Sequence, residues 1–265
     1  MTQNILIIPH YNNPKGLEKS IASIGASELL DVIIIDDGSV SEKINESLIL
    51  QNKKFKGDII FKYCSVNRGV EYVLNEGIDY ALEKNYKYIS RLDCGDLCDE
   101  NRFKIQEDFL NKNTHIGIVG SQVNALDEKG NFLYEITLPT EERKVRNGML
   151  IGAMFIHPTI MFRANIVEKV GKYPTHYKAA EDFAFFTNIL KYYDGANIDK
   201  VLVSIELNSK GISLKNRKTQ ALSRINILKD NYQFGIRSTY GIFRSYILYY
   251  TPYSLIHLLK KILYK

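Results

Sequence analysis

The sequence is poor in cysteine and proline and has no long apolar run. Three cysteines and six prolines among 265 residues provide neither a disulfide framework nor a proline-rich linker, and the odd cysteine count favours a reducing compartment. No segment reaches the roughly 18 consecutive apolar residues that span a bilayer. The N-terminal segment MTQNILIIPHYNN lacks a basic region before its apolar residues, so we expect a first strand there and no signal peptide. These absences favour a cytoplasmic protein.

Residues 231–265 contain no acidic residue and five basic ones. Their charge of +5 equals the net charge of the whole chain. The rest of the chain is close to neutral, which argues against nucleic acid as a partner of the whole fold. With 45% hydrophobic and 25% charged residues, the composition is that of a globular protein. A chain of this length forms one large domain, or one domain with an appendage.

The first half alternates β-branched runs with amphipathic stretches. Four runs predict strands, at 4–9, 31–36, 58–64 and 86–93. The intervening stretches have apolar residues at a spacing near 3.6 and predict helices at 16–24, 41–50 and 70–84. This alternation implies a mainly parallel sheet covered by helices, in which ligands bind at the carboxyl ends of the strands.

The second half is less regular and predicts an α+β arrangement. We expect two strands within 115–139 around a turn at 128–131, and a third strand at 199–207. A strand at 155–163 should lead into a helix that ends at Gly171. Further helices are expected at 140–151 and 179–193, and the tail is helical from about residue 213.

Two acidic clusters follow predicted strands. In DDGS (36–39), Asp36 and Asp37 could accept hydrogen bonds from a nucleoside, or the segment could serve as a turn with Ser39 capping a helix. In DCGD (93–96), Asp93 and Asp96 offer the oxygen ligands that Mg²⁺ and Mn²⁺ prefer. The alternative for this second cluster is that it caps the N-terminus of a helix.

Asp99 and two cysteines belong to the same acidic segment. Asp99 is expected to complement the dipole of a helix at 101–110. Structural zinc at Cys94 and Cys98 is disfavoured, because their C-x3-C spacing has no histidine nearby. We therefore interpret these cysteines as small, partly buried apolar residues.

Two segments of the second half could supply acid–base groups. Glu181 and Asp182 stand at the start of an aromatic helix, where they could complement its dipole or bring a general base to a site in the first half. His157 could be a packed hydrogen-bonding residue or an acid–base group.

Taken together, these segments resemble the family 2 glycosyltransferases with the GT-A fold, from about residue 4 to residue 217. In this order and at these spacings the set is specific. The matching segments are IIPHYN (7–12), IIIDDGS (33–39), NRGVEYVLNEGI (67–78), RLDCGDLCDENRFKIQ (91–106), HPTIMFR (157–163), GKYP (171–174), AEDFAFF (180–186) and SKGISLKNRKTQ (209–220).

The resemblance implies an inverting transferase that moves a sugar from a nucleotide diphosphate, with UDP favoured by family frequency, onto an acceptor hydroxyl. It divides the chain into a catalytic domain, 1–212, with a nucleotide-binding half at 1–110 and an acceptor-binding half at 111–212, and a helical region at 213–265. Asp182 would be the general base, with Glu181 beside it. Residues that would line the nucleotide pocket are Pro9, Tyr11, Asp36, Asp37, Asn67, Arg68 and Asp93.

The same resemblance assigns Asp93 and Asp96 to a divalent metal, Mn²⁺ or Mg²⁺. His157, Lys210 and Arg217 would lie near the diphosphate or the acceptor. The chain departs from the family in two ways. The acidic motif commonly reads D-x-D, but here Gly95 takes the third position and leaves Asp96 as the main metal ligand. The segment VEYVLN (70–75) is bulkier than its usual counterpart, so the shape of the sugar pocket is not inferred.

The basic tail predicts contact with an anionic membrane surface or with a second subunit in a homodimer. Leu255, Leu258, Leu259 and Ile262 fall on one helical face, with basic residues beside it. Membrane contact would place the enzyme at the inner face of the cell membrane, with a saccharide or lipid-linked acceptor of bacterial surface polysaccharide synthesis. Two rival functions are a non-catalytic sugar-nucleotide-binding scaffold and a nucleotidyltransferase.

Overall fold

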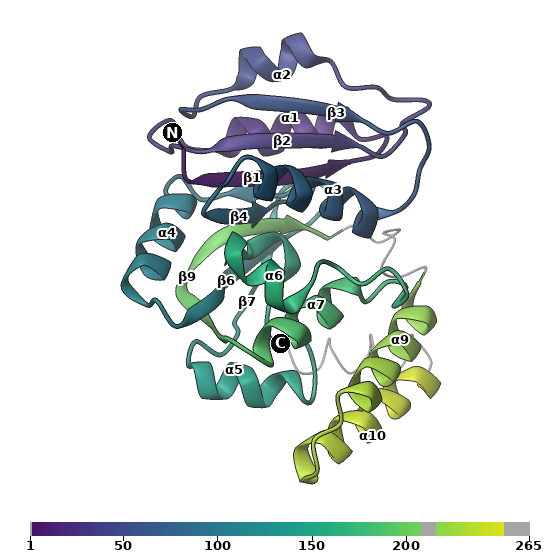
Figure 1. Cartoon of the computed structure of the whole chain (residues 1–265). Coiled ribbons are helices and arrows are strands. Elements are labelled where there is room, and N and C mark those ends of the chain that lie inside the picture. The colour runs from purple at the N-terminus through teal and green to yellow at the C-terminus, as the bar shows by residue number, and fades with distance from the viewer. Residues whose placement is uncertain (1, 208–215, 252–265) are drawn as a thin grey trace.

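The computed structural model describes residues 2–207 and 216–251 and places the first half in parallel strands linked by helices (Figure 1). The parallel strands are β1 (Asn4–His10), β2 (Asp31–Asp36), β3 (Ile59–Tyr63) and β4 (Tyr88–Arg91). The helices between them are α1 (Pro14–Ser23), α2 (Glu46–Asn52) and α3 (Val70–Glu83). The predicted alternation of strands and helices is confirmed for this half.

The second half extends the same sheet with strands of both directions. It contributes β5 (Leu97–Cys98), β6 (Ile116–Leu126), β7 (Phe132–Ile136), β8 (Met161–Arg163) and β9 (Asp194–Glu206). The strand order is β3-β2-β1-β4-β8-β6-β9-β5, and β7 pairs with β6. Of the added pairings, β6 with β9 is parallel and the others are antiparallel. The sheet is therefore mixed, and the expectation of a mainly parallel sheet holds only for its first half.

The remaining helices surround this second half and form the C-terminal region. They are α4 (Arg102–Lys112), α5 (Glu142–Met149), α6 (Val167–Val170), α7 (Glu181–Leu190), α9 (Arg217–Asp230) and α10 (Ile236–Tyr250). Two 3₁₀ turns, η1 (His157–Thr159) and η2 (Ala164–Ile166), flank β8. In the part of the chain that is described, no helix combines the length and apolar character needed to cross a membrane.

Strands β1 and β2 bury both of their faces, which explains their unbroken apolar sequences. Ile5 and Ile7 of β1 belong to a core shared with α3 and α7. Leu6 and Ile8, which point to the opposite face, belong to a second core that includes residues of α1, α2 and α4. The sheet is thus covered by helices on both faces, as expected for parallel strands.

Three expected boundaries are corrected by the structure. The strand expected at 155–163 is reduced to Met161–Arg163, because residues 157–159 form the turn η1 with Pro158 near its start. The helix expected from residue 41 begins at Glu46, where the Asn45 side chain accepts the backbone N–H of Leu48. Strand β9 starts at Asp194, five residues before the expected 199.

The N-terminus of α4 is capped by a residue far away in the sequence. The Glu28 carboxylate accepts the backbone N–H groups of Phe103 at 2.8 Å and Lys104 at 3.1 Å. Asp99, which we expected to complement the dipole of this helix, accepts the N–H of Asn101 at 3.2 Å and lies 3.6 Å from the Lys200 ammonium. The two hydrogen bonds to the first turn of α4 thus come from Glu28, in the loop before β2, while Asp99 lies beside the same helix end.

Helices α9 and α10 lie side by side at one edge of the molecule (Figure 1). The approach of α10 to the segment after α5 depends on Gly241. A Cβ atom added there would lie 1.9 Å from the Leu150 carbonyl oxygen, so any side chain would force the helix away. The predicted stripe from Leu255 to Ile262 lies outside the described residues.

Candidate active site

The strand order places the acidic clusters at one edge of the sheet. Because β1 lies between β2 and β4, the carboxyl ends of these three strands meet at the point where the direction of strand addition reverses, the usual ligand site of an open α/β sheet. His10, the last residue of β1, pairs in register with Asp36, the last residue of β2. The structure thus brings the segments after β1, β2 and β4 together at one sheet edge.

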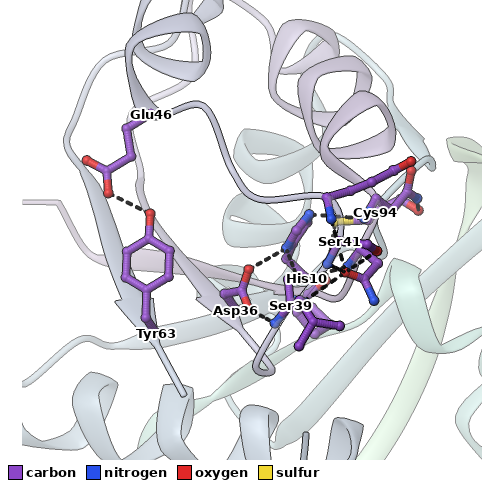
Figure 2. Close-up of polar contacts among 12 residues, drawn as sticks. His10, Asp36, Ser39, Ser41, Glu46, Tyr63 and Cys94 are labelled. Carbon is purple, nitrogen blue, oxygen red and sulfur yellow. Dashed lines mark hydrogen bonds and ion pairs between the residues drawn. The ribbon is translucent and has the colours of Figure 1, made fainter. Parts of the chain in front are cut away.

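Asp36 is held by a buried network centred on His10 (Figure 2). The His10 Nδ1 atom lies 2.9 Å from an Asp36 carboxylate oxygen, and the backbone N–H of Ser39 donates to the other oxygen at 2.6 Å. The Nε2 atom of His10 accepts the N–H of Asn13, so Nδ1 carries the proton and donates to Asp36. The inspection of the sequence missed His10, whose only signal is its place at a strand end.

Asp37 fastens the loop that carries Asn67 and Arg68. Its two carboxylate oxygens accept the backbone N–H groups of Arg68 at 2.8 Å and Gly69 at 2.9 Å. This leaves the side chains of Asn67 and Arg68 exposed, with the Arg68 guanidinium 4.5 Å from the ring centre of Tyr72. The alternative in which Ser39 caps a helix is wrong, since its hydroxyl accepts the N–H of Asn12.

Helix α1 holds the DCGD turn through the side chain of Ser20. The Ser20 hydroxyl donates to the Asp96 carbonyl at 2.8 Å and accepts the N–H of Gly95 at 3.0 Å. Gly95 has a φ of +106°, and a Cβ atom there would have no neighbour within 4 Å. Glycine is therefore needed at this position for its backbone conformation. The space beside it is open to a ligand.

The first strand's Pro9 touches this turn through its carbonyl oxygen, which lies 3.3 Å from the Cys94 thiol. Burial and the neighbouring aspartates raise the pKa of the Cys94 thiol, which is typical of a cysteine buried in an apolar setting. No group of three or more His, Cys, Asp or Glu side chains in the described ranges is placed to hold a metal. Tyr11, which follows on the same loop, is 46% exposed.

Asp93 and Asp96 differ in environment. The Asp93 carboxylate is partly exposed and lies 2.6 Å from a guanidinium nitrogen of Arg91. Asp96 is buried, and one of its oxygens accepts the N–H of Glu206 at 3.1 Å. Burial, followed by the charge of Asp93, raises the pKa of Asp96 well above its ordinary value. Carboxylate oxygens of this kind are the donors that a hard divalent cation prefers.

Arg91 is a site residue that the sequence inspection missed. It is 5% exposed, and its Nε and Nη1 atoms have no hydrogen-bond partner. Its carbonyl oxygen accepts a hydrogen bond from the buried Arg102 guanidinium at 2.7 Å, which fixes the end of β4. The available signal was an arginine two residues before the first acid of DCGD. Buried donors without partners indicate a place prepared for an anionic or polar ligand.

His157 reaches this region from the second half as a neutral group. Burial, followed by the charge of Arg91, lowers the pKa of His157 well below its ordinary value. Its Nε2 atom lies 2.9 Å from the Tyr173 hydroxyl. The side-chain amide of Asn75, on α3, donates to the Tyr173 carbonyl and accepts the Tyr173 N–H, both at 2.9 Å. His157 therefore offers hydrogen bonding here, without a positive charge.

Glu181 and Asp182 begin helix α7 and face the same region as Arg91. The Asp182 carboxylate accepts the N–H of Phe183 at 2.7 Å. Burial, followed by the charge of Asp182, raises the pKa of Glu181 to about 7, while Arg91 acts to lower it. The charge of Arg91 thus acts on Glu181 of α7 and on Asp96 of the DCGD turn.

Of the basic residues expected near the diphosphate or acceptor, Arg217 has another task in this structure. Its guanidinium donates to the carbonyls of Leu248 at 3.0 Å and Thr251 at 2.6 Å, and so ties α9 to the end of α10. Lys210 lies outside the described residues.

The model of Glycosyl transferase family 2 matches residues 5–171, more than half of the chain. The chain is 25% identical over 234 residues to an uncharacterized glycosyltransferase of Methanocaldococcus jannaschii, covering 86% of this chain and 79% of that protein. It is 25% identical over 240 residues to the UDP-Gal:alpha-D-GlcNAc-diphosphoundecaprenol beta-1,3-galactosyltransferase of Escherichia coli, covering 89% and 84%.

Solved structures share the fold at low sequence identity. S. aureus TarS 1-349 in complex with UDP-GlcNAc superposes with a TM-score of 0.65 at 14% identity, over 93% of this chain and 73% of that one. The mannosyltransferase PcManGT from Pyrobaculum calidifontis, in complex with GDP-Man and Mn²⁺, gives 0.62 at 14% identity, over 94% and 69%. The mixed sheet with flanking helices is the expected GT-A fold.

Proposed function

The chain belongs to glycosyl transferase family 2 and is a glycosyltransferase; on that premise we propose that it moves a sugar, with inversion, from a UDP-sugar to an acceptor hydroxyl. The observation that carries the proposal is Arg91, a buried cation with unpartnered donors that is paired with Asp93 of the DCGD turn and whose charge also acts to lower the pKa of Glu181 on helix α7. A leaving diphosphate and a general base belong on the two sides of a reacting sugar, and these two segments supply the groups for each side.

The donor nucleotide would occupy the half at 1–110. Asp36 or Asp37 would meet the base, and the exposed Arg68 and Tyr11 would close over the nucleotide. Pro9, Asn67 and Asp93 would complete the pocket, with Asp93 on the ribose. Donors named with related proteins support a UDP-sugar, because the E. coli relative is named for UDP-Gal and TarS was solved with UDP-GlcNAc.

A divalent metal, Mn²⁺ or Mg²⁺, would be held by Asp96 with Asp93. When bound, it would neutralise the negative charge of the donor diphosphate. The oxygen donors and their mutual repulsion fit such an ion, and PcManGT was solved with Mn²⁺. Arg91 fixes the Asp93 carboxylate through its 2.6 Å contact, so this ligand would need little reorganisation when the donor binds.

The acceptor would bind in the half at 111–212, where Asp182 would take the proton of the attacking hydroxyl. Glu181 beside it would tune that basicity through its own charge, and His157 would orient the acceptor or diphosphate by hydrogen bonding. One carboxylate on the face opposite the leaving group suffices for a direct displacement, which inverts the anomeric centre.

We further propose that the acceptor is lipid-linked and that the region 213–265 lies against the inner face of a membrane. On α10 an apolar stripe is exposed to solvent at a spacing of three and four residues, formed by Ile236, Tyr240, Phe243, Ile247 and Tyr250. The absence of acids from 231–265 suits an anionic lipid surface. The E. coli relative, whose name includes diphosphoundecaprenol, supports a lipid-linked acceptor.

Replacing the proposed base tests the function. A panel of nucleotide sugars is first scored for Mn²⁺-dependent thermal stabilisation, because a ligand that binds the folded state raises its stability. Sugar release from the best donor is then compared among wild type, D182N and D108N, whose Asp108 is exposed on α4. We expect D182N to lower turnover about 10²–10⁴-fold and D108N to match wild type.

Three results would contradict the proposal. Near-normal turnover by D182N would remove Asp182 from the role of base. Donor binding by wild type without any sugar release would favour the non-catalytic scaffold, and release of pyrophosphate from a nucleoside triphosphate would favour a nucleotidyltransferase.

A further inference from the structure

A cavity of about 300 Å³ lies between helices α7, α9 and α10, outside the donor site. Three arginines line it: Arg217 and Arg224 from α9, and Arg244 from α10. The rest of the lining is largely apolar and includes Phe183, which directly follows the proposed base in the sequence. The cavity thus combines a concentration of positive charge with a position beside Asp182.

The positive charges in this cavity lack carboxylate partners. None of the three guanidinium groups lies within 4.0 Å of an acidic oxygen in the residues that the structure describes. Arg244 makes one long hydrogen bond, 3.4 Å, to the Ile151 carbonyl. Arg217 is committed to the two carbonyls at the end of α10, so Arg224 and Arg244 are the cations left for a ligand.

Arg224 is the more unusual of the two. Its Nε atom is buried without a hydrogen-bond partner, and its guanidinium lies 5.7 Å from the ring centre of Phe183. Burial, with a contribution from Arg244, lowers the pKa of Arg224, while Asp182 acts to raise it. Arg224 as a whole is half-buried, but a buried N–H donor without a partner is costly unless a ligand accepts its hydrogen bond.

From this geometry we propose that the cavity binds a phosphate or diphosphate group carried by the acceptor, held by Arg224 and Arg244. The planar guanidinium fork matches phosphate oxygens in pairs, which favours phosphate as the ligand. A sugar whose anomeric phosphate sits here would have its hydroxyls on the side of α7, where Phe183 lines the cavity and Asp182 precedes it. This inference rests on the proposed function and deepens it, because it makes the charged group of the acceptor a specificity determinant.

The test uses the full chain and inorganic pyrophosphate as the probe, in buffer with EDTA so that no metal supports binding at the donor site. Calorimetric titration compares wild type with R224Q, R244Q and the matched control K218Q. Lys218 is an exposed cation on α9 next to Arg217, but it does not line the cavity. We expect R224Q and R244Q each to weaken binding about tenfold or more, and K218Q to stay within about twofold.

Arg244 is exposed, so R244Q keeps the test valid even if R224Q fails to fold. Wild-type affinity in R244Q, or an equal loss in K218Q, would overturn the proposal. It would also be overturned if wild type ignored pyrophosphate while R244Q lost binding to phosphatidylglycerol vesicles, since the cavity would then take lipid headgroups.

Failure of this inference is distinguishable from failure of the proposed function. Mn²⁺-dependent stabilisation by UDP is measured in the same variants and depends on the donor site alone. If R244Q keeps UDP binding and loses pyrophosphate binding, both proposals are supported. If wild type binds pyrophosphate but no nucleotide, the cavity assignment stands and the proposed donor is wrong.

Discussion

At the scale of single residues, the site is organised by how charge is buried. Arg91 keeps its guanidinium 5% exposed, beside the Asp93 carboxylate and with donors unused. The same cation lowers the pKa of His157 and opposes the rise in the pKa of Glu181. Burial first, and then this arginine, lowers the pKa of His157, and the same cation opposes the rise in the pKa of the carboxyl groups of Glu181 and Asp96.

Glu181 provides a pH test at this scale. Because its pKa is raised to about 7, the carboxyl is neutral below that pH and charged above it. A negative charge on Glu181 favours movement of the acceptor proton into this region, so we expect kcat/KM to rise as the pH passes through about 7. In E181Q this rising limb should disappear. The pH profile of sugar transfer, measured from pH 5 to pH 9, checks the prediction.

The control for this profile is E168Q, in which an exposed carboxylate on α6 is neutralised. In E168Q the rise in kcat/KM should occur near the same pH as in wild type. An E181Q enzyme that kept the rise near pH 7 would assign that transition to another group.

At the scale of elements, long-range side-chain contacts determine where helices begin and how loops are fixed. Helix α4 is capped by Glu28 from the loop before β2, and the loop after β3 is held by Asp37 from the end of β2. In both cases a buried carboxylate accepts two backbone N–H groups that would otherwise lack partners. Such contacts position the polar residues of the site by linking neighbouring strand ends.

The cap of α4 is tested by comparing two acids. E28A removes an acceptor that is 3% exposed and serves two N–H groups, so we expect the free energy of unfolding to fall by about 1–2 kcal/mol. D99A removes an acid near the same helix that does not cap it, and should cost less than about 0.5 kcal/mol. Urea unfolding at neutral pH measures both values, and a larger loss in D99A would reverse the assignment.

At the scale of the whole molecule, the proposed arrangement places one sheet edge toward the donor and the C-terminal helices toward a membrane. Phe243 of α10 is 63% exposed on the apolar stripe, and Phe132 of β7 is 61% exposed elsewhere on the molecule. Substituting each of these two phenylalanines therefore distinguishes a membrane contact on α10 from a general effect of exposed apolar side chains. Phe243 lies on the helix without acids, whereas Phe132 lies on a strand that also carries Glu135.

We expect F243S to weaken binding to phosphatidylglycerol vesicles by about tenfold, since burying one phenylalanine side chain contributes about 1.5–3 kcal/mol. F132S should bind like wild type. Vesicle co-sedimentation at physiological salt gives both affinities, and size-exclusion chromatography without lipid tests the homodimer. If F243S changed the oligomeric state and left vesicle binding intact, the stripe would be a contact between subunits.

Much of the fold and part of the site followed from local patterns in the sequence. The apolar strands, the helices between them and the turn between β6 and β7 were predicted because each has its own periodicity or turn residues. The residues missed, His10 and Arg91, have no such local signal. Their importance comes from burial and from partners tens of residues away, such as Asp36 for His10.

The sequence by itself determined the family, the parallel first half and the strand-end positions of the acids, because those depend on residue type and spacing. Only the tertiary structure decided how those acids are used. Asp37 holds a loop, Glu28 caps α4, and Arg217 ties two helices together. The mixed direction of the later strands and the arginine cavity also depend on contacts between distant segments, which no local pattern encodes.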